Sequence, residues 1–327
     1  MRVLMVGFGA VGQVFGLFLQ KAGVELGCHD RPAATEKLEQ ALEHGGLSLF
    51  QVQSRGKPPV AHRLDNFQVL ADIAECQRFK PDLIWFTVPS PVYYSEWFRD
   101  FLQQVPAEHV ACFTPEGRRA EFFLPGTGSD VVFGGVTFMA WQGDLEGGGG
   151  KANAVNFWLS PLGIPLQGTE KSCSTVKQLL QKAGFKVMVG KAGSSQQAST
   201  TAVMTAYMAG LELSGWNLRR FRKSPWLVRS ARAAREAAYS QVGQPGLSTK
   251  ISIGMLCSST VFFLITSLLP FLFPFDIEKY LKFHYRKTRD QTLALLEVFA
   301  ADAEKQGVPS AYTRMLLAGL LGSDKTT

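Results

Sequence analysis

Three glycines near the start of the chain restrict its fold more than any other feature. Residues 2–6 form a short apolar run that is followed directly by the three glycines, Gly7, Gly9 and Gly12. The apolar spacing over 11–22 predicts a helix that ends at Gly23, and residues 24–29 have the composition of a second buried strand. Glycines at this spacing, between a strand and a helix, indicate a βαβ unit.

Each glycine has its own expected role in such a unit. Gly7 makes the tight turn, Gly9 lets the backbone approach a pyrophosphate, and Gly12 allows the helix to pack closely on the strand. The amide dipoles at the start of the helix then face the phosphates. The motif therefore predicts a dinucleotide site made by the whole loop, Gly7, Phe8, Gly9, Ala10, Val11 and Gly12.

The rest of the first half continues this pattern. The apolar runs at 82–88, 109–114 and 130–138 are short and rich in β-branched or aromatic residues, as in strands covered on both faces. Residues 141–168 have the pattern of a glycine-linked hairpin, and 174–190 that of one more helix and strand. We predict an α/β Rossmann domain over 1–190, with a doubly wound, mostly parallel sheet.

Strand patterns disappear from the second half, where helical spacing dominates. The segments with this spacing are 196–222, 227–240, 251–269, 276–306 and 311–321. They predict an all-α C-terminal domain over 191–327, which we assign to substrate binding and dimerisation.

Two neighbouring residues at the end of the second predicted strand bear on the choice of dinucleotide. An acid here, such as Asp30, favours the free ribose 2′-hydroxyl of NAD, whereas an arginine, such as Arg31, accommodates the 2′-phosphate of NADP. The planar guanidinium matches a phosphate well. We therefore expect NADP(H), held by Arg31, and NAD(H) remains the alternative that Asp30 supports.

Charge and cysteine content narrow the function classes. The net charge of +7, from 34 Lys and Arg against 27 Asp and Glu, fits a phosphate-bearing ligand, a nucleic acid or an anionic membrane surface, and charge alone does not choose among them. Five cysteines are scattered without a C-x-x-C pair, so we expect neither a disulfide framework nor a metal site. A signal peptide would have to overlap the glycine motif, so we expect a cytoplasmic protein.

Much of the positive charge lies in one segment, 219–235. Charge runs are usually solvated surface. The alternatives are capture of a carboxylate or phosphate, or a nucleic-acid or membrane surface with Phe221 and Trp226 interleaved. No nucleic-acid-binding motif accompanies the segment, so we expect no nucleic-acid partner.

An uncharged segment at 251–275 is long enough to cross a bilayer. Serines and threonines dilute it, and Pro270 and Pro274 interrupt its second half. We therefore expect a buried core helix, and a membrane association through 251–275 is the disfavoured alternative.

Several features together resemble the ketopantoate reductase (2-dehydropantoate 2-reductase) family. They are the N-terminal GFGAVGQVFG, the Arg31 that follows it, the helical second half and the closing FDIEKYLKFHYRKTRDQTLALLEVFAADAEKQGVP. The resemblance covers most of the chain and is most specific at its two ends. It implies a Rossmann domain, a helical domain like the C-terminal domain of 6-phosphogluconate dehydrogenase, NADPH in the cleft between them, and hydride transfer to the ketone of a small 2-oxo acid. It also implies that 251–275 lies inside the helical bundle.

The resemblance points to further cofactor positions, at which this chain departs from the family pattern. Thr87-Val88-Pro89 stands where the family usually has Thr-x-Lys, and Glu116-Gly117 stands where it has Asn-Gly. The family's ribose-binding Glu corresponds to a glutamine. The corresponding positions in this chain give four cofactor-binding candidates: Thr87, Pro89, Glu116 and Gln291.

The proton donor of the family, a lysine on the first long helix of the second domain, has no counterpart, since 193–215 contains no Lys or Arg. A reductase must protonate or polarise the carbonyl oxygen while hydride attacks. Helical spacing places three donors on one helix face, with Gln291 continuing it: Tyr280, His284 and Lys287. These three are our catalytic candidates, and the helix that normally bears the lysine adds Glu212 and Tyr207.

Three hypotheses follow from the sequence. The first is an NADP(H)-dependent oxidoreductase that acts on a small carboxylate or carbonyl compound, either as a monomer or as a homodimer. The second is a non-catalytic NADP(H)-binding sensor or scaffold with the same fold. The third is a membrane-associated protein.

Overall fold

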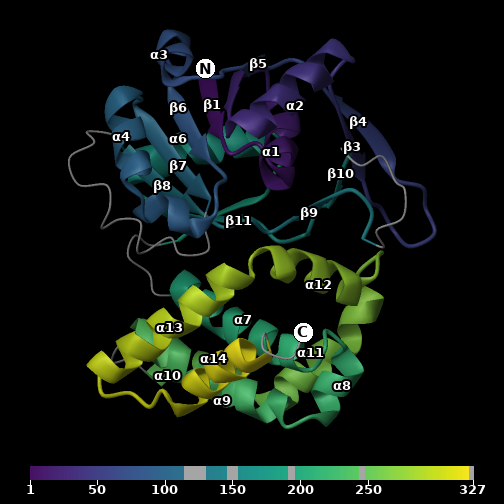
Figure 1. The fold of residues 1–327 in the computed structure, drawn as a ribbon, viewed down its shortest axis with the longest axis vertical. Helices are drawn as coiled ribbons and strands as arrows, with labels where there is room; N and C mark the ends of the chain where they lie inside the picture. The colour runs from purple at the N-terminus through teal and green to yellow at the C-terminus, as the bar shows by residue number, and fades with distance from the viewer. Residues whose placement is uncertain (114–129, 146–153, 191–195, 243–246, 324–327) are drawn as a thin grey trace. The chain divides into compact units, whose positions relative to one another are not determined.

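The computed structural model describes residues 1–113, 130–145, 154–190, 196–242 and 247–323 (Figure 1). Within it the chain divides into two compact units, Met1–Ser194 and Ser195–Thr327. The first unit is α/β and the second is helical, which confirms the predicted fold class.

An eight-stranded, mostly parallel sheet forms the centre of the N-terminal unit. Its strands are β1 (Arg2–Val6), β2 (Glu25–His29), β5 (Gln68–Val69), β6 (Leu83–Phe86), β7 (His109–Phe113), β8 (Asp130–Gly134), β11 (Ile164–Gly168) and β12 (Val187–Val189). They follow the order β12-β11-β8-β7-β6-β1-β2-β5, and β8 with β11 is the antiparallel pair of this sheet. The order steps outward from β1 in both directions, as a doubly wound sheet requires.

Helices cover both faces of this sheet. They are α1 (Ala10–Lys21), α2 (Pro32–Glu43), α3 (Ile73–Phe79), η1 (Ser90–Tyr94), α4 (Glu96–Gln104) and α6 (Glu170–Lys182). Strand β1 shows why both faces are apolar. Its side chains alternate, so that Val3 and Met5 join the core that contains α1 and α6, while Leu4 and Val6 join the core that contains α3 and α4.

A second, four-stranded sheet lies against α1. Its strands are β3 (Leu47–Gln51), β4 (Val60–Leu64), β9 (Met139–Gln142) and β10 (Val155–Trp158), in the order β4-β3-β10-β9. Phe157 of β10 meets Phe18 of α1 edge to face, with ring centroids 6.0 Å apart. The antiparallel pairing of β9 with β10 confirms the predicted hairpin. The partner strands β3 and β4 were not predicted.

The C-terminal unit is built around two closely packed helices, α7 (Gln196–Leu213) and α9 (Trp226–Val242). A Cβ at Gly210 of α7 would collide with the Ser230 hydroxyl of α9, so glycine permits this approach. The remaining helices are α8 (Leu218–Lys223), α10 (Leu247–Leu256), α11 (Ser259–Leu272), α12 (Ile277–Lys287), α13 (Arg289–Lys305) and α14 (Ala311–Ser323).

Three segments predicted as continuous helices are each broken in two. The 196–222 segment breaks between α7 and α8, where Gly215 and Trp216 have positive φ angles of 72° and 59°. The 276–306 segment breaks at Thr288, between α12 and α13. The 251–269 segment breaks after α10, and the two helices there are bent by 54°.

The expectation that 251–275 forms a buried core helix was wrong. On α11 the buried side chains are Phe262 and Thr266, whereas Leu264, Leu268 and Phe271 are 57%, 56% and 78% exposed. In the described part of the chain, no single helix is long and apolar enough to cross a membrane. Helices α10 and α11 meet that test only when taken together as a bent pair.

Candidate functional site

The glycine loop joins β1 to α1, and two of its glycines are needed for packing. Gly7 has a φ of +84°, and a Cβ there would lie 2.7 Å from the Val88 side chain. A Cβ at Gly12 would lie 2.5 Å from the Gly7 carbonyl oxygen. The Thr87 hydroxyl donates a hydrogen bond to that same oxygen. Thr87 therefore holds the loop from the neighbouring strand end.

Gly9 differs from the other two glycines because space surrounds it. No heavy atom lies within 4 Å of the position that a Cβ would take. Gly9 is also the N-cap of α1, and the described residues supply no side-chain cap and no acid in the first turn. Uncapped N–H groups at a helix start attract anions. The open Gly9 position and these donors together fit a phosphate group.

Asp30 braces this loop. At the end of β2 its Oδ2 accepts a hydrogen bond from the Phe8 backbone N–H at 2.6 Å. Its Oδ1 accepts a hydrogen bond from the Arg31 backbone N–H at 2.7 Å. Both carboxylate oxygens thus already have backbone donors, one in each loop that borders the site.

Arg31 begins α2. It is the N-cap residue, Pro32 follows at the first helical position, and the Arg31 carbonyl accepts the backbone N–H groups of Ala34 and Thr35. The rigid proline and these two bonds fix the backbone at Arg31. Its exposed side chain lines the same pocket as Gly9.

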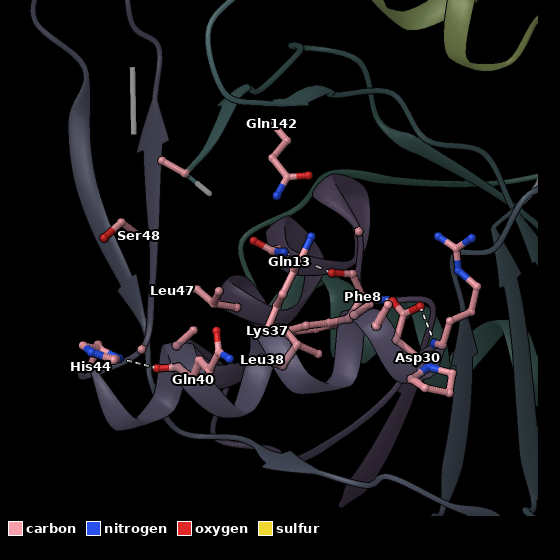
Figure 2. Close-up of a pocket in the computed structure, with 18 residues that line it drawn as sticks. Phe8, Gln13, Asp30, Lys37, Leu38, Gln40, His44, Leu47, Ser48 and Gln142 are labelled. Atoms are coloured by element: carbon pink, nitrogen blue, oxygen red, sulfur yellow. Dashed lines mark hydrogen bonds between the residues drawn. The ribbon is translucent and has the colours of Figure 1, made fainter. Parts of the chain in front are cut away.

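The pocket has a volume of about 940 Å³ and lies within the N-terminal unit (Figure 2). The glycine loop, α2 and the second sheet form its walls. Three of the predicted cofactor residues line it: Phe8, Gly9 and Arg31. The pocket lining does not include the other predicted cofactor residues that the structure describes in this unit, which are Gly7, Ala10, Val11, Gly12, Thr87 and Pro89. Glu116 lies outside the described residues.

Several polar side chains of the pocket were missed by the sequence analysis. Gln13 of α1 is 6% exposed, and its Nε2 donates a hydrogen bond to the Phe8 carbonyl at 3.1 Å. Its Oε1 has no hydrogen-bond partner among the described residues. The other missed polar residues are Lys37, Gln40, His44, Ser48 and Gln142 (Figure 2). Gln13 stands directly after the motif and could have been found, but Ser48 and Gln142 belong to the unforeseen second sheet.

The three donors predicted on one helix face lie on α12. The rings of Tyr280 and His284 stack with centroids 5.7 Å apart. Burial, and then the nearby Lys287 charge, lower the pKa of His284 below its usual value. Desolvation also lowers the pKa of Lys287, whose Nζ lies 4.0 Å from the centroid of the Phe283 ring.

We had predicted that the same helix face continues to Gln291, but the helix ends before it. Helix α12 ends at Lys287, and Gln291 belongs to α13 beyond the break at Thr288. The stripe of four residues on one face is therefore a stripe of three.

The other two candidates are held by neighbours in the bundle. Glu212 Oε1 accepts a hydrogen bond from Arg289 Nε at 2.6 Å, and Arg289 also donates to the Leu320 carbonyl. Tyr207 is fully buried and stacks on Phe262, and burial raises the pKa of its hydroxyl. An ion-paired carboxylate and a buried phenol are poor sources of a proton at neutral pH.

Comparisons with known proteins show the fold. No protein-family model matches the chain, and no curated protein is similar enough in sequence to be matched. Solved structures match over the full length. A 2-dehydropantoate 2-reductase from Geobacter metallireducens has a TM-score of 0.71 at 14% identity, covering 99% of this chain and 100% of that one.

Two further solved structures with this fold are a ketopantoate reductase and D-mandelate dehydrogenase. A ketopantoate reductase from Ralstonia eutropha has a TM-score of 0.69 at 16% identity, covering 99% of each chain. D-mandelate dehydrogenase in complex with NADH has a TM-score of 0.66 at 16% identity, covering 100% of this chain and 99% of that one. The same enzyme is also solved in a ternary complex, with NADH and anilino(oxo)acetate. At these identities, the chain shares the fold of ketopantoate reductases and D-mandelate dehydrogenase.

Proposed function

We propose that this chain is an NADP(H)-dependent oxidoreductase that reduces the carbonyl group of a small 2-oxo acid or related compound. The observation that carries the proposal is the open position beside Gly9, next to the uncapped start of α1 and in one pocket with Arg31. A pyrophosphate needs such a close backbone approach, and the helix start supplies donors for it. NADH in the mandelate dehydrogenase neighbour supports the same class of cofactor.

The arrangement of Asp30 and Arg31 favours the phosphorylated cofactor. The Asp30 oxygens already accept hydrogen bonds from two backbone N–H groups. The exposed Arg31 guanidinium offers the planar donors that a 2′-phosphate requires. Phe8, Gly9 and Arg31 would thus hold the cofactor, with the orphaned Gln13 Oε1 as a further acceptor in the same pocket.

For the chemical step, a bound dihydronicotinamide supplies a hydride, and this chain must supply a proton to the carbonyl oxygen. We assign this role to Lys287 on α12. A lowered pKa brings its ammonium closer to the pH of the reaction, which favours proton transfer. The lowered pKa of His284 keeps that imidazole neutral at pH 7, so we do not assign the donor role to it.

A turnover assay tests this proposal. The full chain is mixed with NADPH and a panel of small 2-oxo acids, and the loss of nicotinamide absorbance is followed. We expect turnover with one or more of them, and about a 100-fold lower kcat for Lys287→Met with unchanged NADPH affinity. The rate should fall as the pH rises through the Lys287 pKa, because the protonated donor is lost.

Lys282→Met is the matched control, since Lys282 is an exposed lysine on the same helix. Its kcat should equal that of the wild type. Equal rates for Lys287→Met and Lys282→Met would remove Lys287 from the reaction. NADPH binding without turnover of any 2-oxo acid would favour a non-catalytic sensor. Helix α7 contains no lysine, which is consistent with that alternative.

A further inference from the structure

Helix α11 reverses the usual arrangement of a surface helix. Helices of globular proteins turn apolar side chains to the core and polar ones to water. In α11 the inward side chains are Phe262 and Thr266, and the outward face carries apolar residues at helical spacing. We call this outward set the α11 face: Phe263, Leu264, Ile265, Leu268, Phe271 and Leu272. All 14 residues of the helix are uncharged.

Basic side chains stand directly beside this face. Helix α8 packs against α11 within the same unit (Figure 1). Arg222 Nη1 donates a hydrogen bond to the Thr266 carbonyl at 2.7 Å, and its guanidinium lies 5.9 Å from the ring centroid of Phe263. Arg219 and Lys223 are exposed, and they lie three residues before and one residue after Arg222. We call Arg219, Arg222 and Lys223 the basic rim.

Two acidic residues lie next to this region, at the start of α12. Neither α8 nor α11 contains an acid. At the start of α12, Glu278 accepts a hydrogen bond from the Leu218 backbone N–H at 2.8 Å. Asp276 caps α12 by accepting from the Lys279 backbone N–H at 3.1 Å. The three positive charges of the basic rim outnumber these two carboxylates, so the charge next to the apolar surface is net positive.

We propose that the α11 face and its basic rim dock this protein onto an anionic lipid surface. An apolar helix face enters the boundary between headgroups and acyl chains, and Lys and Arg beside it meet the anionic headgroups. The helix lies along the surface and does not cross it. Fourteen residues at 1.5 Å each span about 21 Å, less than the roughly 30 Å hydrocarbon core.

Charge complementarity distinguishes this occupant from a second copy of the chain. A symmetric dimer through the α11 face would place the same patch on both subunits, including the basic rim. Like charges brought together in this way repel. Anionic lipids instead offer the opposite charge together with an apolar layer.

Vesicle flotation with the full chain tests the proposal. The probes are vesicles of phosphatidylcholine alone and vesicles that also contain phosphatidylserine. We expect binding to the phosphatidylserine vesicles, which added salt weakens. Phe271→Asp should lower this binding at least about 10-fold, because the exposed ring that enters the lipid is replaced by a charge. Leu162→Asp is the control, since Leu162 is 66% exposed in the other unit.

The basic rim has its own pair of variants. The double variant Arg219→Gln, Lys223→Gln should lower binding to phosphatidylserine vesicles about 30-fold, at about 1 kcal/mol for each charge. The double variant Lys57→Gln, Lys182→Gln removes two exposed charges elsewhere and should bind as the wild type does. Equal binding of Phe271→Asp and wild type overturns the proposal. So does a dimer that Phe271→Asp dissociates in the absence of any vesicle binding.

Discussion

At the scale of single residues, the three glycines of the loop have different surroundings and so different roles. Backbone or side-chain atoms fill the Cβ positions of Gly7 and Gly12, whereas the position beside Gly9 is empty. Gly7 and Gly12 therefore belong to the stability of the fold. Gly9 is the glycine whose missing side chain leaves room for a ligand.

This difference predicts opposite effects of two similar substitutions. Gly12→Val should lower the free energy of unfolding by about 1–3 kcal/mol, because the new side chain collides with the Gly7 carbonyl. Gly9→Val should cost about 1 kcal/mol or less, since it weakens only an N-cap, yet it should lower NADPH affinity at least tenfold. Denaturant unfolding and a binding titration measure the two effects. Unchanged NADPH affinity in Gly9→Val would assign all three glycines to packing.

The sequence was most informative at this scale where a motif has strict stereochemistry. The spacing of the three glycines predicted the tight connection between β1 and α1, and the structure has that connection. It did not reveal that Asp30 braces the loop, since a carboxylate can turn to the ligand or to the Phe8 backbone without any change in sequence. Only the hydrogen bonds of the structure show that Asp30 turns to the Phe8 backbone.

At the scale of elements, an ion pair joins two helices of the C-terminal unit, and one of its members, Glu212, had been a catalytic candidate from the sequence. Glu212 of α7 and Arg289 of α13 have side chains only 15% and 20% exposed. A largely buried carboxylate needs its partner, because solvation cannot replace the missing charge. This pair ties α13 to α7.

Removing one partner tests this structural role. Arg289→Met should lower the free energy of unfolding by about 2 kcal/mol or more, because Glu212 loses its counter-charge. Arg314→Met breaks the ion pair with Glu304, where both side chains are about half exposed, and should change the stability little. Chemical denaturation measures the free energy of unfolding of both variants. Equal stability losses would mean that the Glu212 pair contributes no more than a surface pair.

Element boundaries were harder to predict than element types. Periodicity found the helical segments, but the break at Thr288 leaves the apolar spacing intact on both sides. The second sheet escaped prediction because the parallel pairing of Leu49 in β3 with Val155 in β10 joins segments about a hundred residues apart. Apolar composition on α11 was also ambiguous, since a buried helix and an exposed apolar helix have the same hydropathy.

At the scale of the whole molecule, the fold is shared with proteins of very low sequence identity. These structural neighbours have 12% to 17% identity and still match along nearly all of this chain. Many different sequences can form this architecture, because it requires only alternating apolar positions in the strands and small residues between α7 and α9. The fold therefore followed from patterns, whereas the choice of substrate depends on individual side chains and stays a proposal.

The central claim is that Arg31 and the open glycine loop form an NADP(H) site, and a cofactor titration tests it most directly. The full chain, Arg31→Ala and the control Arg78→Ala, an exposed arginine on α3, are each titrated with NADPH and with NADH. We predict that the wild type binds NADPH more tightly than NADH, and that Arg31→Ala alone loses about 10-fold or more in NADPH affinity with little change for NADH. Equal losses for both cofactors, or no binding of either, would contradict the account.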